Sequence, residues 1–199
     1  MIEFDAETHK YTVGGIVYPS VTQLIPRNPG FGYVTAERLA EKADYGKFVH
    51  KCIDNYLKGE ESFSFSEEET VIRKHAKKFF SEFGVPTLSE SIVWSEKNKF
   101  AGTLDLYWAN EKRIGDIKTR KADKKRDALQ CAGYAIAAKE KFGLKKAIKD
   151  WYTIEFIEGC QPRAVYVYND QAERLFIALV ENHWRGKKLD TALVAYFSN

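Results

Sequence analysis

The sequence predicts an α/β (α+β) fold with a mostly mixed β-sheet and flanking helices, and three observations carry this prediction. β-prone runs with very short separators occupy the middle of the chain. Helical patterns with one apolar face precede and follow them. The chain has 199 residues, of which 44% are hydrophobic, which suffices for one sizeable core. Because no repeat or long linker is apparent, we expect a single domain over residues 1–199, with an N-terminal hairpin and helical elaboration over about residues 1–60.

The first elements predict this hairpin and a helix. Residues 9–13 and 16–18 are β-prone and flank Gly14-Gly15, a pair that easily supplies the positive φ angles of a tight turn. A short segment ends at Pro26, and residues 27–33 form a Pro- and Gly-containing loop. A helical pattern follows from residue 35 to about 57, for which we expect a break near Gly46.

A second helix is indicated by a capping box, in which Ser66 is followed three residues later by Glu69. Three strand-like runs come next, at residues 88–95, 102–108 and 113–119, and their short separators predict an antiparallel meander. The remaining expected elements are a helix over about 124–142 with Gly143 as its stop, strands over 148–157 and 163–168, a helix from Asn169 or Asp170 to about 184, and a short helical tail.

Composition excludes several classes of protein. The net charge of +3 is too small to be a nucleic-acid signature, so any basic footprint must come from clustering. The longest apolar stretch, residues 131–138, is too short to span a membrane, and the first residues do not resemble a signal peptide. Cys52, Cys131 and Cys160 are scattered, which favours reduced thiols in an intracellular, cytoplasmic protein. No phosphate-binding loop for ATP is present.

One constellation carries chemistry. Asp116 and Lys118 are two apart on a predicted strand, so their side chains should emerge on the same face, and Asp105 lies on the preceding antiparallel strand. Two carboxylates held close are costly unless a cation lies between them, and oxygen ligands suit Mg²⁺ or Mn²⁺. Such an ion beside a lysine fits phosphodiester hydrolysis. The alternative is an ordinary surface ion pair of Asp116 and Lys118.

The following helix adds a weaker signal, because Gln130 and Tyr134 are four apart and share one helical face. Taken together, Asp105, Asp116-x-Lys118 and Gln130-x-x-x-Tyr134 resemble the PD-(D/E)XK nuclease superfamily, and the last pair points to its RecB-type exonuclease branch. Residues 46–50, which end in His50, are similar to the upstream Gly-x-x-x-His helix of that branch, and residues 18–22 resemble its Pro-Ser-Val-Thr element. The resemblance is greatest to mitochondrial genome maintenance exonucleases and their bacteriophage relatives.

This resemblance implies a restriction-endonuclease-like core and a metal ion, Mg²⁺ or Mn²⁺, held by Asp105, Asp116, the Ile117 carbonyl and His50. It implies that Lys118 activates water or stabilises the transition state, and that Gln130 and Tyr134 orient the DNA backbone or the lysine. The sequence departs from the commonest pattern in having Asp116 where Glu is frequent; no Pro precedes Asp105, which is usual in this branch.

Other candidate residues have two interpretations each. Glu90 is either an extra metal ligand or a structural carboxylate. Ser20 and Thr22 either bind a phosphate or cap a helix, and the aromatic residues Phe31, Tyr33 and Tyr45 either stack on bases or pack in the core. The basic run after the catalytic strand either contacts the DNA backbone or is a solvated loop; it comprises Arg120, Lys121, Lys124, Lys125 and Arg126.

The function that we expect is a metal-dependent DNA exonuclease that prefers single strands or free ends, with replication or recombination proteins as candidate partners. A structure- or sequence-specific endonuclease is a second hypothesis, because the fold family hosts both activities. A catalytically silent nucleic-acid-binding module is a third. The complete set of Asp105, Asp116 and Lys118 argues against it.

Overall fold

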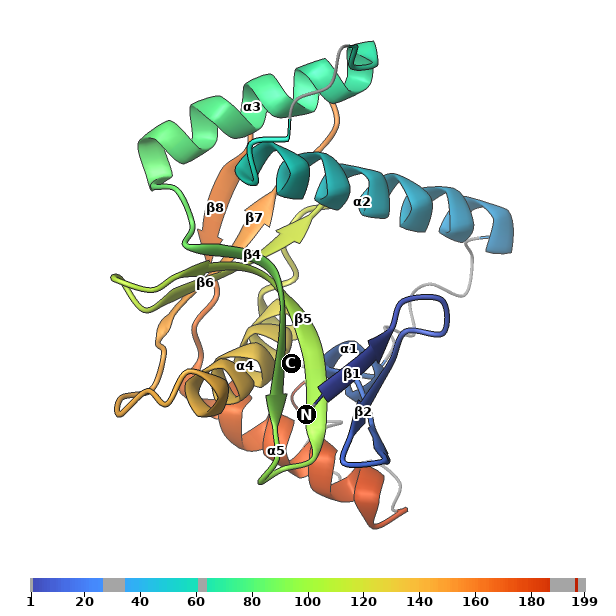
Figure 1. The fold of residues 1–199 in the computed structure, drawn as a ribbon, viewed down its shortest axis with the longest axis vertical. Coiled ribbons are helices and arrows are strands. Elements are labelled where there is room, and N and C mark those ends of the chain that lie inside the picture. Colours follow the sequence, from blue (N-terminus) through green and yellow to red (C-terminus); the bar gives the residue numbers. More distant parts are fainter. Residues whose placement is uncertain (1, 27–34, 61–63, 187–195, 197–199) are drawn as a thin grey trace.

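A computed structural model describes residues 2–26, 35–60, 64–186 and 196 (Figure 1). The predicted loop over 27–33, with Phe31 and Tyr33, and most of the predicted helical tail lie outside these residues. The strands are β1 (Ile2–Asp5), β2 (Lys10–Val13), β3 (Ile16–Tyr18), β4 (Leu88–Ser95), β5 (Phe100–Trp108), β6 (Arg113–Lys118), β7 (Asp150–Glu155) and β8 (Arg163–Tyr166). The helices are α1 (Val21–Leu24), α2 (Ala36–Leu57), α3 (Glu67–Phe83), α4 (Lys124–Lys141) and α5 (Asp170–Trp184).

The strands form two sheets. A five-stranded sheet has the order β4-β5-β6-β7-β8; β6 and β7 are parallel and the other neighbours are antiparallel. The predicted meander and mixed sheet are therefore confirmed, with α4 as the crossover that parallel neighbours require. A three-stranded antiparallel sheet, β1-β2-β3, joins the large sheet where Ala101 donates its N–H to the Pro19 carbonyl over 3.1 Å.

Helices cover both faces of the large sheet, with α2 and α3 on one face and α4 and α5 on the other (Figure 1). The core under α4 and α5 contains Leu104, Ile114, Trp151, Leu129 and Phe176. The core under α2 and α3 contains Leu106, Trp108, Ile117, Ile53 and Phe80. Burial of these two cores fixes both layers against the sheet. None of the helices in the described part of the chain combines the length and apolar character needed to cross a membrane.

In the N-terminal region one prediction is wrong and one strand was missed. Helix α2 runs without a break through Gly46. One glycine costs a helix only about 1 kcal/mol, and the buried residues Val49, Cys52 and Ile53 anchor the helix just beyond it. Strand β1 was not predicted, because a four-residue run at the chain start carries little periodicity. It forms by pairing with β2, where Phe4 lies opposite Tyr11.

Candidate metal centre

The candidate site forms where β5 and β6 separate. The ladder between these strands runs from Trp108–Arg113 to Leu106–Gly115. At the next position a side chain replaces a main-chain partner, because the Asp105 carboxylate accepts the N–H of Ile117 over 2.7 Å. A charge-assisted hydrogen bond therefore holds the Asp105 carboxylate of β5 against β6, the strand of Asp116 and Lys118.

The other neighbour of β5 is also distorted at this point. Glu90 on β4 has a φ of +43°, and the ladder pairs the residues on each side of it, Ser89 with Leu106 and Ser91 with Leu104. Leu104 and Leu106 belong to opposite cores, although alternate residues of a regular strand share a face. The alternation of side chains between the two faces of β5 therefore shifts by one residue at Asp105. Such local distortions re-aim side chains, and here Asp105 and Glu90 reach the same space.

His50 reaches this space from α2. Its Nδ1 lies 3.2 Å from Glu90 Oε1 and 3.7 Å from Asp105 Oδ2, and its Nε2 lies 3.1 Å from the Ile117 carbonyl oxygen. Both ring nitrogens face acceptors, and this setting favours the imidazolium form, which can donate to both. Burial alone would lower the pKa of His50, but the carboxylates of Asp105 and Glu90 outweigh it and raise the pKa from 6.5 to about 9.

A second group lies beside this one. Lys118 Nζ is 2.6 Å from Asp116 Oδ2, which confirms that the two side chains share a face. From α4, Gln130 donates to Asp116 Oδ1 over 2.7 Å and to the Tyr134 hydroxyl over 3.1 Å. Burial raises the pKa of Asp116 to about 7, helped by Asp105 and opposed by Lys118. Burial also raises the pKa of Asp105, against the effect of His50.

These residues fit a divalent cation. Ligand atoms of His50, Glu90 and Asp105 all lie within 4.8 Å of one another. The buried Oδ2 atom of Asp116 has no hydrogen bond, and Lys118 is its ion-pair partner. The carboxylate donors suit Mg²⁺ or Mn²⁺, and a cation would offset the cost of burying both aspartates.

The structure groups the predicted ligands differently from the sequence. It brings His50 and Asp105 together with Glu90, the residue that was an additional candidate. The carboxylate of Asp116, in contrast, faces Lys118 and Gln130, and the Ile117 carbonyl accepts a hydrogen bond from His50. The ligand set His50, Asp105, Asp116 and Ile117 therefore stays a prediction, with Glu90 now placed beside two of its members.

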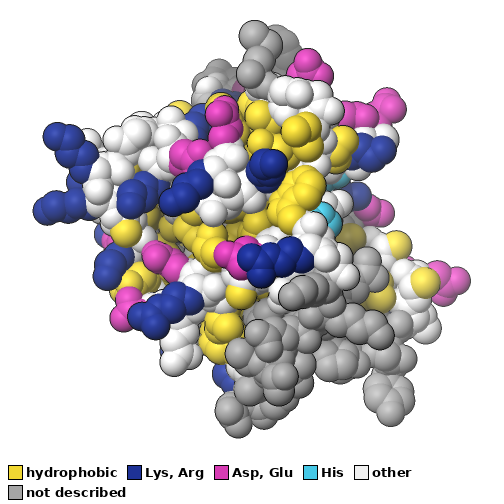
Figure 2. Space-filling model, turned by 90° about the horizontal axis from the view of Figure 1, so that it is seen from below, with side chains coloured by type: hydrophobic (Ala, Val, Ile, Leu, Met, Phe, Trp, Pro, Cys, Tyr) yellow, Lys and Arg dark blue, Asp and Glu magenta, His cyan; other side chains and the backbone are white. Residues whose placement is uncertain are grey.

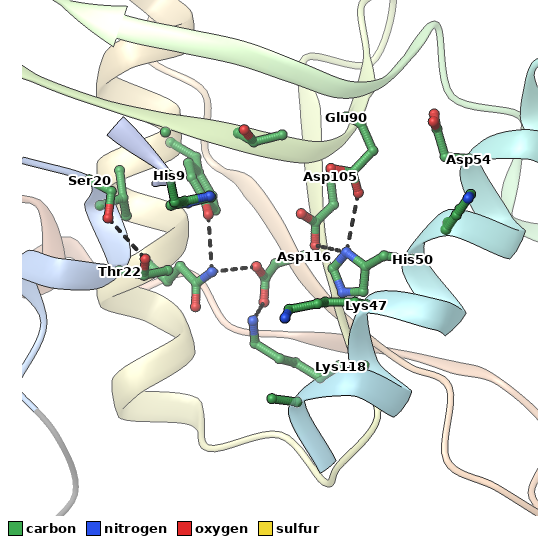
Figure 3. A pocket seen from close by; sticks show the side chains of 18 of the residues that line it. His9, Ser20, Thr22, Lys47, His50, Asp54, Glu90, Asp105, Asp116 and Lys118 are labelled. Atoms are coloured by element: carbon green, nitrogen blue, oxygen red, sulfur yellow. Dashed lines mark hydrogen bonds and ion pairs between the residues drawn. The ribbon is translucent and has the colours of Figure 1, made fainter. Parts of the chain in front are cut away.

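Both groups line one cavity of about 820 Å³. Figure 3 shows Asp105, Asp116 and Lys118 between two walls, with His9, Ser20 and Thr22 on one side and Lys47, His50 and Asp54 on the other. The first wall comes from the N-terminal sheet and α1, and the second from α2. Ser20 caps α1 by a capping box with Gln23, so its helix-cap interpretation is confirmed, while Ser20 and Thr22 also face the cavity.

The predicted basic run lies elsewhere. Arg120 forms a bidentate pair with Asp127 at 2.5 and 3.2 Å, Arg126 donates to the Pro26 carbonyl, and Lys125 lies over the Tyr196 ring at 5.9 Å. Lys121 and Lys124 are exposed. None of the five predicted cations lines the cavity, where Lys47 and Lys51 do.

The face of the molecule seen from below carries mixed charge. Figure 2, the view from below, shows Lys and Arg side chains interspersed with acidic and apolar ones rather than gathered into one patch. Lys47 and Lys51 flank His50 in the sequence, so they could have been found from their place in the predicted motif. Tyr45, a candidate for base stacking, packs against the core under α2 and α3.

No protein-family model matches the chain, and no curated protein matches it either. The functional assignment therefore rests on the residues and their geometry.

Proposed function

We propose that this protein is a metal-dependent nuclease of the PD-(D/E)XK type that hydrolyses phosphodiester bonds in DNA, as an exonuclease on single strands or free ends. One observation carries the proposal: a His50–Glu90–Asp105 cluster and an Asp116–Lys118 pair face the same cavity. Carboxylates that fit a divalent ion, next to a partly buried ammonium, are the groups that phosphodiester hydrolysis needs.

Glu90, Asp105 and Asp116, together with His50 once its ring has lost a proton, are the side chains that would hold Mg²⁺ or Mn²⁺. When bound, the ion would polarise a phosphoryl oxygen and acidify a water molecule. The chain supplies the placement of these ligands, because β6 holds Asp105 through the Ile117 amide and α4 holds Asp116 through Gln130. Ligands fixed by such outer contacts bind and orient a metal better than free side chains.

Lys118 supplies a fixed positive charge. Burial would lower its pKa, but Asp116 and Asp105 raise it, so the side chain stays protonated. An ammonium in a buried site stabilises negative charge that develops on a phosphate far more strongly than one in water. Gln130 connects this pair to Tyr134, which supports a positioning role for both residues.

The volume of the cavity favours a short stretch of one strand as its ligand. A volume of about 820 Å³ is that of a site for a drug-sized ligand, which matches a short stretch of one strand. Lys47 and Lys51 on one wall can pair with its phosphates. Lys121 and Lys124 remain candidates for contacts outside the cavity. Cys52 and Cys131 are buried and unpaired, which supports an intracellular location.

The decisive experiment uses end-labelled linear and circular single-stranded DNA with Mg²⁺, Mn²⁺ or EDTA. We expect cleavage of the linear strand with metal, none in EDTA, and no cleavage of the circle. Asp105→Asn and Asp116→Asn should each abolish cleavage, while Asp170→Asn, an exposed acid at the start of α5, should leave it unchanged. Cleaved circles would establish an endonuclease. DNA binding without cleavage under every metal condition would establish a silent binding module.

A further inference from the structure

The turn between β1 and β2 carries a side chain into the candidate site. Asp5 accepts hydrogen bonds from the N–H groups of Glu7 and Thr8, at 2.9 and 3.2 Å, and from the Thr8 hydroxyl at 2.6 Å. These bonds fix the turn. His9, the residue directly before β2, then adopts a φ of +51°. It is exposed and lines the cavity.

The backbone of His9 follows a pattern that recurs in this chain. Lys99 directly before β5 and Lys112 directly before β6 have φ angles of +57° and +52°. Glycine is the residue favoured in this left-handed region, so all three positions hold a side chain at some conformational cost. The turn geometry alone therefore does not distinguish His9. What distinguishes it is that His9 lines the cavity, whereas Lys99 and Lys112 do not.

The imidazole of His9 rests on two aromatic rings. Its centroid lies 5.4 Å from that of Phe4 and 5.5 Å from that of Tyr11, both edge-to-face, and Phe4 stacks on Tyr11 at 4.7 Å. The Tyr11 hydroxyl bonds with Thr103 Oγ1 over 2.8 Å, which ties the group to β5. His9 is thus an exposed ring with a rigid support. A ring fixed in advance loses little conformational freedom when a ligand contacts it.

The position of this ring complements the other wall. Figure 3 shows His9 across the cavity from Lys47 and His50, with Asp105 and Asp116 between them. A strand whose phosphates pass the metal ligands and the lysines of α2 would direct a base toward the N-terminal sheet. Aromatic rings that face a single-strand channel commonly stack on bases.

We propose that His9, braced by Phe4 and Tyr11, is a nucleobase-stacking residue that holds one base of the single strand in the cavity. This inference rests on the proposed function, since it assigns a contact to the same substrate. Stacking needs the face of a ring and no particular base, so the contact would be independent of sequence.

The test measures the affinity of the full chain for fluorescent single-stranded oligonucleotides, with Ca²⁺ in place of Mg²⁺. His9→Asn removes the ring, and asparagine tolerates a positive φ. We expect about tenfold weaker binding, within the range for one stacked base. The matched control is Lys112→Asn, which places asparagine at the same kind of turn outside the cavity. This variant should bind the oligonucleotides like the wild type. Thermal midpoints of both variants should remain close to the wild-type value.

Oligonucleotides with one abasic position distinguish stacking from a phosphate contact. At the stacked position, loss of the base should weaken binding to the wild type about tenfold and add almost nothing to the loss caused by His9→Asn. Additive losses at every position would overturn the proposal in favour of a backbone contact. Unchanged affinity of His9→Asn, with a wild type that binds and cleaves DNA, would refute this inference alone. A wild type that neither binds nor cleaves DNA would refute the proposed function as well.

Discussion

Glu155 at the end of β7 shows how one buried carboxylate secures the segment behind β6, the strand of Asp116 and Lys118. It is 2% exposed and accepts the Ala122 N–H over 2.7 Å and the Arg163 Nε–H over 2.6 Å. The loop that follows Lys118 is therefore tied to β7 by one side chain. The hydrogen bond from Arg163 is the main reason that the pKa of Glu155 lies below its ordinary value of 4.5.

A lowered pKa means that Glu155 stabilises the fold above its ordinary pKa, and that this contribution is lost as the pH falls through the folded-state value. We expect Glu155→Gln to lower the free energy of unfolding by about 1–2 kcal/mol at neutral pH, since Arg163 is solvent-exposed and screened. The difference between the two proteins should shrink below about pH 4. Urea titrations across this range measure it, and a difference that persists at the acid end would contradict the assignment.

Lys118 gives the second prediction for a single residue. The Lys118 ammonium is expected to act mainly on transition-state charge. Lys118→Ala should therefore lower the cleavage rate by several orders of magnitude, whereas it should lower DNA affinity much less. Single-turnover rates and affinity in Ca²⁺ separate the two effects. Lys51→Ala, which removes an exposed cation from the cavity wall, is the matched control and should affect affinity more than rate. Parallel losses of rate and affinity in Lys118→Ala would make it an ordinary phosphate contact.

At the scale of elements, two helical glycines should respond in opposite directions to the same substitution. A Cβ atom on Gly46 in α2 would meet only Thr119 Oγ1, at 3.8 Å. On Gly133 in α4 it would lie 2.6 Å from Phe176 Cζ and 2.9 Å from Val21 Cγ1, and both side chains are fully buried. Gly133 is therefore a position at which α4 closely approaches α5 and α1.

We expect Gly46→Ala to raise the free energy of unfolding by about 1 kcal/mol, because alanine is the better helix former. Gly133→Ala should lower it by about 1–2 kcal/mol, since overpacking exceeds the gain in helix propensity. Chemical denaturation of both variants tests the packing of the two layers. Stabilisation by Gly133→Ala would mean that α4 and α5 are less closely packed.

At the scale of the molecule, the path that we propose for DNA depends on which cations line the cavity. Lys47 and Lys51 do, whereas Lys77 and Lys78 are exposed on α3 outside it. For each tenfold rise in salt concentration, the logarithm of the affinity for a single strand falls by about 0.7 per phosphate contact. Replacement of both Lys47 and Lys51 by Ala should flatten that slope by about 1.4, and replacement of Lys77 and Lys78 should leave it unchanged. The reverse result would place the DNA on α3.

The sequence by itself determined much of this protein. The strands β4 to β6 and the helices α3, α4 and α5 follow from local periodicity, caps and short separators, because these signals arise between residues a few positions apart. The shared face of Asp116 and Lys118 follows in the same way from the period of a strand, and their ion pair confirms it.

Only the tertiary structure decided which distant residues meet. His50 joins Glu90 and Asp105 because α2 packs on the sheet, and Glu90 points there because β4 is distorted opposite Asp105. Arg120, a candidate for a DNA contact, is paired with the fully buried Asp127, since a buried carboxylate without a partner is costly. The continuity of α2 through Gly46 and the strand β1 likewise come from burial and pairing across the molecule, which short-range patterns do not encode.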